Sequence, residues 1–130
     1  MRNQAVWIDQ SEARVFNVEG AAFDEKTVHA ANHHVHRHPK GDLTKMHNHL
    51  NDEARFFGEV LALLGDAEGI LLLGPSVTKL HLLRHAQQHA PKVAALVVGV
   101  ETADHPTDGQ LVAHIRHYFN DDRPRRGVAP

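Results

Sequence analysis

The sequence predicts an α/β fold in which helices cover both faces of a mixed five-stranded sheet. Three observations lead to this prediction. Short apolar runs recur between turn residues, as strands do. Three strand-like segments follow one another closely in the first third of the chain, and helical patterns alternate with strands in the remainder. The 130 residues, 42% hydrophobic and 23% charged, are enough for one domain with its own core.

The first three predicted strands form an antiparallel meander. Residues 5–8 are a continuous apolar run, which is typical of a strand covered on both faces. Asp9 opens a turn, and residues 13–18 form the second strand. Residues 26–30 form a third strand that is polar enough to lie at the edge of the sheet, where Val28 could pair across a homodimer.

A helix follows in which Asn51 is the predicted N-cap and Gly65 the stop. Its apolar positions fall on one seam at helical spacing. The seam consists of Phe57, Val60, Leu61 and Leu64, with Arg55, Glu59 and Ala62 opposite. This seam requires an apolar partner, and the meander supplies one.

Two more strands and two more helices complete the pattern. Residues 69–74 are apolar and too short for a helix, and Ser76 is the predicted N-cap of a helix that Pro91 ends. Residues 92–100 form the last strand, and residues 107–110 match a capping box at the start of the last helix.

The predicted order is β-β-β-α-β-α-β-α. Right-handed crossovers then give the strand order 3-2-1-4-5, which is a ribonuclease H-like topology. We expect a single domain over residues 1–120, a histidine-rich loop at 31–48 and a polar tail at 121–130.

Composition excludes several classes of site. The chain has no cysteine, so disulfides, cysteine-based zinc sites and thiol nucleophiles are ruled out. No segment matches a signal peptide or a membrane span, so we expect a cytoplasmic protein without a membrane partner. The net charge of −2 does not by itself attract nucleic acid, but the 13 histidines make the charge sensitive to mild acid.

The segment from Ala30 to Leu50 has no sustained apolar period and is interrupted by Pro-Lys-Gly. A long polar insertion between two regular elements is more often functional than accidental. It contains six histidines, namely His33, His34, His36, His38, His47 and His49. Imidazoles at alternate positions lie on one side of an extended backbone, as those of His34, His36 and His38 would. Together with His33 they are candidate ligands for zinc or nickel. A solvated histidine tract gives the same pattern.

Recognition of a polyanion is the other interpretation of this loop. Arg37, His38, Lys40 and Lys45 supply positive groups for RNA phosphates. Lys79 joins them as a candidate because it follows a helix N-terminus, the kind of backbone that binds anions, although a simply capped helix start is the favoured interpretation.

Other polar residues have simpler interpretations. His81, His85 and His89 lie at i, i+4 and i+8, and we expect them to point outward, with a metal clamp as the alternative. His114 and His117 are expected to be partly buried. A two-metal nuclease needs several converging acids, and no acid follows the fourth strand to join the one that ends the first.

Three segments resemble a known family. They are VWIDQSEARVFNVE at 6–19, ILLLGPSVTKLHLLRH at 70–85 and GVETADHPTDGQLVAHIRHYF at 99–119. They are similar to the stand-alone bacterial "translational machinery" proteins. More distantly, they resemble host-attachment proteins and the middle domain of archaeo-eukaryotic release factors and Pelota. The similarity covers nearly the whole chain outside the loop and the tail.

This resemblance gives the histidine-rich loop a role. In release factors the same connection carries the Gly-Gly-Gln tripeptide that triggers peptidyl-tRNA hydrolysis, whereas HHVHRHPKGDLTKMHNH contains no such tripeptide. The resemblance therefore implies a non-catalytic protein that binds the ribosome or RNA through this loop. The alternatives are a metal-binding protein that uses the loop histidines and a protein-interaction or attachment module.

Overall fold

The computed structural model describes residues 2–30 and 43–127, with the backbone alone along 43–51 and 120–127. The elements follow one another in an order close to the predicted one. They are β1 (Arg2–Ile8), β2 (Glu12–Glu19), β3 (Ala22–His29), α1 (Leu43–Ala62), β4 (Gly69–Gly74), α2 (Thr78–His89), α3 (Pro91–Ala94), β5 (Val97–Thr102) and α4 (Asp108–Gly127).

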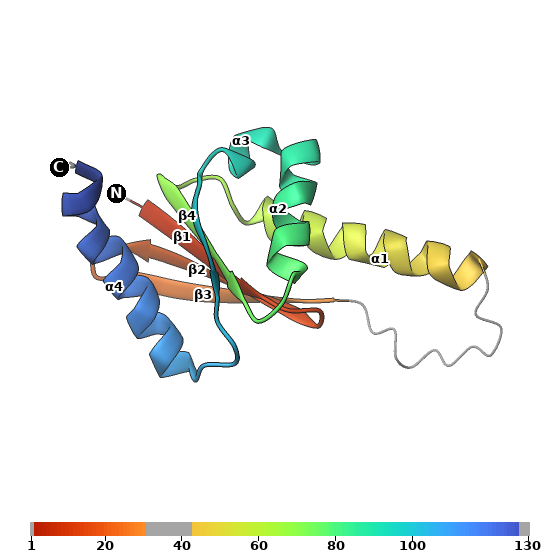
Figure 1. Cartoon of the computed structure of the whole chain (residues 1–130), viewed down its shortest axis with the longest axis horizontal. Helices are drawn as coiled ribbons and strands as arrows, with labels where there is room; N and C mark the ends of the chain where they lie inside the picture. The colour runs from red at the N-terminus through yellow and green to blue at the C-terminus, as the bar shows by residue number, and fades with distance from the viewer. Residues whose placement is uncertain (1, 31–42, 128–130) are drawn as a thin grey trace.

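The five strands form one sheet in the order β3-β2-β1-β4-β5, which confirms the predicted topology. The meander pairs antiparallel, whereas β4 pairs parallel with both β1 and β5. Helices α1, α2 and α3 lie on one face of the sheet and α4 lies on the other (Figure 1). The carboxyl ends of β1, β4 and β5 therefore meet at one edge.

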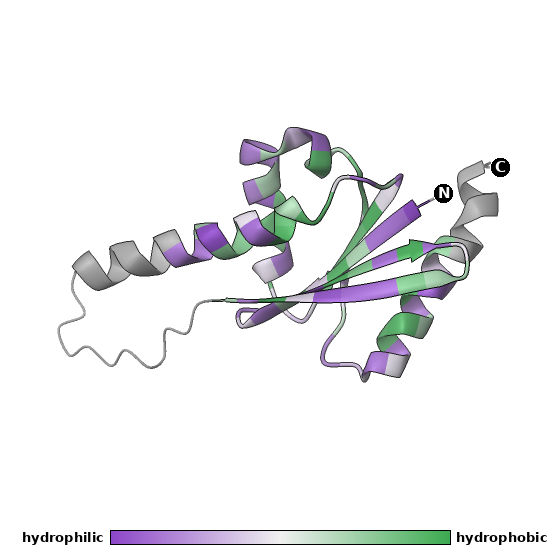
Figure 2. Cartoon of the chain, turned by 180° about the vertical axis from the view of Figure 1, so that it is seen from behind, coloured by the Kyte–Doolittle hydropathy of each residue, from purple (hydrophilic) through white to green (hydrophobic). Residues whose placement is uncertain are grey.

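The core has two halves separated by the sheet. On one face, Val6 and Ile8 of β1 pack with Phe57 and Val60 of α1 and with Leu82 of α2. On the other face the alternate residues of the same strands meet α4 in a second cluster, which includes Ala5, Trp7, Leu71, Leu111 and Ile115. Figure 2 shows this distribution, with apolar residues along the central strands and mostly hydrophilic residues along β3. No helix in the described ranges is long and apolar enough to cross a membrane.

Helix α1 begins at Leu43, two turns before the N-cap predicted at Asn51. That prediction was wrong, and the connection between β3 and α1 is shorter than the predicted loop at 31–48. In the sequence, Leu43, Met46 and Leu50 continue the apolar spacing of the later seam toward the N-terminus. The surrounding histidines and asparagines masked this period. In Figure 1 the N-terminal half of α1 extends beyond the sheet.

Two boundaries in the second half also differ. Helix α2 has Val77 at its N-cap position with no side-chain cap, so the cap predicted at Ser76 is wrong. The segment predicted as one strand over 92–100 divides into the short helix α3 and the strand β5, which starts at Val97. Pro91 lies at the first turn of α3, where its fixed φ favours a helical start.

Strand β5 is an edge strand, as the predicted order 3-2-1-4-5 requires, even though its sequence is largely apolar. Val98 is 44% exposed and Val100 is 37% exposed. The register with β4 shifts between Ile70 and Leu71, which is typical of a bulge at a sheet edge. At the C-terminal end, α4 continues to Gly127, so a helix occupies most of the range predicted as a tail.

The capping box of α4 forms as predicted. The backbone N–H of Thr107 donates to Gln110 Oε1 at 3.0 Å, and the backbone N–H of Gln110 donates to Thr107 Oγ1 at 3.2 Å. Gly65 also fulfils its predicted role, because it takes a positive φ of 119° just after α1. These two sites fix where α4 begins and where α1 ends.

Gly74 at the end of β4 lies close against the backbone of β1. A Cβ added there would lie 2.3 Å from the carbonyl oxygen of Ile8. We therefore expect Gly74→Ala to lower the free energy of unfolding by about 3 kcal/mol, the upper end of the usual overpacking cost. Urea unfolding followed by circular dichroism measures this loss.

Gly58→Ala is the matched control, because a Cβ at Gly58 in α1 would meet nothing within 4 Å. Alanine is the better helix former, so this variant gains about 0.5–1 kcal/mol. Equal stability of the two variants would contradict the packing described for β1 and β4.

Candidate functional site

Most of the predicted site residues lie outside the described part of the chain. This group consists of His33, His34, His36, Arg37, His38 and Lys40. Lys45 belongs to α1, so it is part of a helix and not of the predicted loop. The structure thus describes the two ends of the connection between β3 and α1.

The β3 end of this connection is held by the fold. There, the backbone N–H of Ala30 donates to the carbonyl of Ser11 at 2.8 Å. The Nδ1 atom of His29 lies 4.0 Å from Glu12 Oε1. On the other side, the described core residues of α1 nearest the connection are Phe56 and Phe57, more than three turns after the helix begins at Leu43. The connection therefore starts from a paired strand and joins α1 well before the packed part of that helix.

Lys79 contributes to the structure of the β4–α2 turn. Its side chain is buried, and Nζ donates to the carbonyl of Gly74 at 3.1 Å and to that of Ser76 at 2.6 Å. A buried ammonium requires such partners, and they orient it toward the turn. This placement favours a structural role for Lys79 over the predicted contact with phosphate.

The carboxyl edge of β1 and β5 brings together residues that are distant in the sequence. Asp9 acts as the predicted turn residue, because its Oδ1 accepts from the backbone N–H groups of Ser11 and Glu12. Its Oδ2 lies 3.6 Å from Nε2 of His105, whose Nδ1 lies 3.1 Å from Asp104 Oδ1. An imidazole thus lies between two carboxylates at this edge.

Trp7 fixes the loop that carries this imidazole. Its Nε1 donates to the carbonyls of Ala103 and Asp104, each at 3.1 Å, and its ring meets His105 edge-on at 5.3 Å. Asp104 is nevertheless 93% exposed and His105 is 66% exposed. The arrangement therefore links β1 to the β5–α4 loop in a largely solvated setting.

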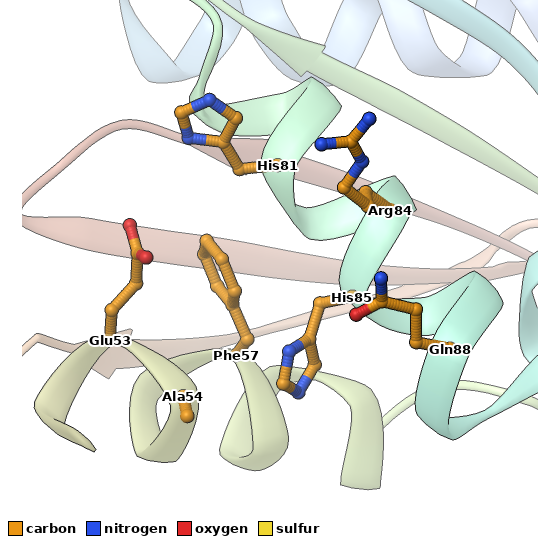
Figure 3. A pocket seen from close by; sticks show the side chains of 7 residues that line it. All are labelled: Glu53, Ala54, Phe57, His81, Arg84, His85 and Gln88. Atoms are coloured by element: carbon orange, nitrogen blue, oxygen red, sulfur yellow. The ribbon is translucent and has the colours of Figure 1, made fainter. Parts of the chain in front are cut away.

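A groove of about 290 Å³ opens between α1 and α2 (Figure 3). One wall comes from α1 and the other from one face of α2. The first wall consists of Glu53, Ala54 and Phe57; the second consists of His81, Arg84, His85 and Gln88. The groove therefore combines an apolar surface, several hydrogen-bond donors and one carboxylate.

His85 does not point outward as predicted. Its ring meets Phe57 edge-on at 5.5 Å and lies 4.4 Å from the ring of His89. Burial, and next the nearby His89, lower the pKa of His85 below its ordinary value of 6.5, while Glu53 acts in the opposite direction. The folded structure therefore favours the neutral form of His85 more than an unfolded chain does.

The other histidines differ from the predictions in part. His114 is exposed, and its Nε2 lies 2.7 Å from Glu101 Oε1, so it does not fill the core as predicted. His81 is exposed, in agreement with the prediction for that position. Among the described side chains, which are those of residues 2–30 and 52–119, no three histidine or acidic groups converge as a metal site would require.

The sequence contained signals for both arrangements that the predictions missed. Asp9 follows β1 and Asp104 follows β5, and parallel strands bring such ends to one edge. The groove depends on the polar flank of α2, where His81, Arg84 and Gln88 recur at helical spacing. Glu53 lies opposite these residues because α1 packs across α2, which is a tertiary contact that the sequence does not indicate.

The fold resembles that of solved archaeal structures, namely two Pelota proteins and a translation termination factor. Pelota from Archaeoglobus fulgidus matches 93% of this chain at a TM-score of 0.63 and 15% identity, and Pelota from Thermoplasma acidophilum matches 89% at 0.60 and 22%. The archaeal translation termination factor aRF1 matches 97% at 0.54 and 10%. The matches cover 32% of each Pelota chain and 41% of the aRF1 chain, so this protein spans about a third of the Pelota proteins.

These matches confirm the predicted release-factor- and Pelota-like fold. A scan of protein-family models and a search of curated proteins give no match. The predicted relation to bacterial translational machinery and host-attachment proteins stays a prediction.

Lys79→Met tests the structural role of the buried ammonium. The substitution leaves the carbonyls of Gly74 and Ser76 without their donor, so we expect a loss of about 1.5–3 kcal/mol in unfolding free energy. Chemical denaturation measures it. Lys92→Met, at an exposed position on α3, should change stability by less than about 0.5 kcal/mol. Equal effects of the two substitutions would remove the structural role.

The lowered pKa of His85 makes its contribution to stability depend on pH. The unfolded chain binds a proton near pH 6.5, whereas the folded protein keeps His85 neutral to lower pH. The stability that the neutral His85 ring contributes to the folded protein is therefore fully present above pH 6.5 and is lost as the pH falls below that value. We expect the stability advantage of the wild type over His85→Gln to shrink between pH 7.5 and 5.5.

Thermal and urea unfolding at the two pH values measure this difference. Gln87→Ala, an exposed neighbour without a titrating group, should follow the wild-type pH dependence. A wild-type advantage that grows on acidification would show that the pKa of His85 is raised.

Proposed function

We propose that this protein is a non-catalytic, translation-associated domain that binds the ribosome or its RNA through the connection between β3 and α1. The observation that carries the proposal is the fold itself. It matches two Pelota structures and a translation termination factor over about nine-tenths of the chain or more. The activities of those whole proteins do not transfer, because this chain spans only part of their length.

The chemistry of the connection supports RNA as the ligand. Arg37, His38 and Lys40 lie within four residues of one another, and Lys45 follows in the first turn of α1. Arginine and lysine neutralise phosphates and release counterions, which gives affinity that falls steeply with salt. The neighbouring imidazoles add positive charge as they become protonated, so mild acid should strengthen the interaction.

The proposal does not include peptide release. The connection holds Pro39-Lys40-Gly41 and no Gly-Gly-Gln. Gln110 follows a glycine, but its side chain is engaged in the capping box at the start of α4, on the opposite face of the sheet from α1. A domain of this fold without the tripeptide can bind the ribosome but has no glutamine at the connection to act on peptidyl-tRNA.

Co-sedimentation with purified ribosomes at 50–300 mM salt tests the proposal. Arg37→Ala combined with Lys40→Ala removes two cationic contacts, so we expect weaker binding and a slope of log K against log salt that is shallower by about 1.5. The wild type should bind at low salt and dissociate as salt is raised.

The matched control is Lys26→Ala combined with Lys92→Ala, which removes the same charge from exposed positions on β3 and α3. This control should bind as the wild type does. Absence of wild-type binding at low salt, or equal weakening in both double variants, would contradict recognition through the connection.

A further inference from the structure

We propose that the groove between α1 and α2 holds one unpaired nucleotide of single-stranded RNA, and that it prefers bases carrying an exocyclic amino group. This inference rests on the proposed function, because it takes RNA as the ligand. It adds a second contact that lies entirely on residues the structure describes. It also predicts base preference, which contact with phosphate alone does not provide.

The α2 wall of the groove is suited to a phosphate or sugar. His81, Arg84 and Gln88 are exposed and lie on one face of the helix, at positions i, i+3 and i+7. A guanidinium donates two parallel hydrogen bonds to a phosphate, and the amide and imidazole add further donors. Within the described part of the chain, none of these three side chains makes a hydrogen bond.

The carboxylate of Glu53, on the opposite wall, discriminates between classes of ligand. A bare phosphate or an acidic peptide would meet electrostatic repulsion from this carboxylate. An amino group on a base edge donates to it, as cytosine N4 does to acidic side chains in other complexes. The ligand that satisfies both walls carries a negative charge and an amino group a short distance apart.

The floor of the groove is apolar and aromatic. Figure 3 shows Phe57 standing between Glu53 and His85, with Ala54 beside it. Phe57 is only 3% exposed, so a base would meet its edge and the neighbouring His85 and would not stack on a free face. Because the fold favours the neutral form of His85, this floor is compatible with an uncharged base.

Size and position agree with one nucleotide. A groove of about 290 Å³ is at the small end of ligand sites, which commonly span roughly 300–1,000 Å³. Glu53 lies ten residues after the first residue of α1, or about 15 Å along the helix axis. A strand of a few nucleotides bound at the connection can therefore extend along α1 to the groove.

Binding of fluorescein-labelled hexa-adenylate and hexa-uridylate to the full chain, followed by anisotropy at pH 7.5, tests this inference. We expect hexa-adenylate to bind more tightly, because uracil has no exocyclic amino group. Arg84→Ala should weaken hexa-adenylate binding about tenfold. Arg55→Ala, which removes the same charge from an exposed position of α1 that does not line the groove, should leave it nearly unchanged.

Glu53→Met provides the second, more specific readout. Loss of both acceptor oxygens should reduce the preference for adenylate over uridylate while keeping the overall affinity within a fewfold. Equal affinity of the wild type for both oligonucleotides would overturn the inference. So would equal effects of Arg84→Ala and Arg55→Ala, or displacement of hexa-adenylate by inorganic phosphate or poly-glutamate at matched charge concentration.

The same titrations separate this inference from the proposed function. If Arg37→Ala/Lys40→Ala abolishes binding while Arg84→Ala has no effect, the connection binds RNA and the groove inference fails. If Arg84→Ala weakens binding while the double variant has no effect, the groove stands and recognition through the connection fails.

Discussion

The burial of β1 and β4 on both faces is the constraint on which the rest of the structure depends. Every residue from Gln4 to Ile8 and from Gly69 to Gly74 is buried. Strands that are apolar on both sides need a layer of helix on each side. The packing of α1 and α2 on one face, and of α4 on the other, follows from this requirement. So does the crossing of α1 and α2 that forms their groove.

The same constraint separates the parts of the protein that can bind a partner from the parts that hold it together. Phe57 and Val60 fix one side of α1 to the sheet, which leaves its polar flank at the groove. Gln4, the buried polar residue of β1, bonds to the carbonyl of Leu63 and the N–H of Gly65. These two hydrogen bonds fix the C-terminal end of α1 against β1.

Much of the sheet could be predicted because the sequence signals for its strands are local. Most of the wrong predictions concern residues whose local signal is masked by neighbouring residues or whose position depends on tertiary contacts. Apolar runs and turn residues indicated the strands, and their order followed from crossover handedness. Histidines hid the apolar period that starts α1 at Leu43. The outward position predicted for His85 overlooked Phe57, which contacts it from another helix. In the sequence, Lys79 has the position of an anion-binding residue. Its two hydrogen bonds to backbone carbonyls can be seen only in the structure.

Ultraviolet cross-linking of the protein to RNA in intact cells, with mass spectrometry of the RNA-linked peptides, is the most direct test of whether the connection and the groove contact RNA. We expect cross-links to ribosomal or transfer RNA in peptides that cover the β3–α1 connection and in those that carry Phe57 or His85. Cross-links confined to α4 on the opposite face, or none above the level of an unrelated protein of similar charge, would contradict it.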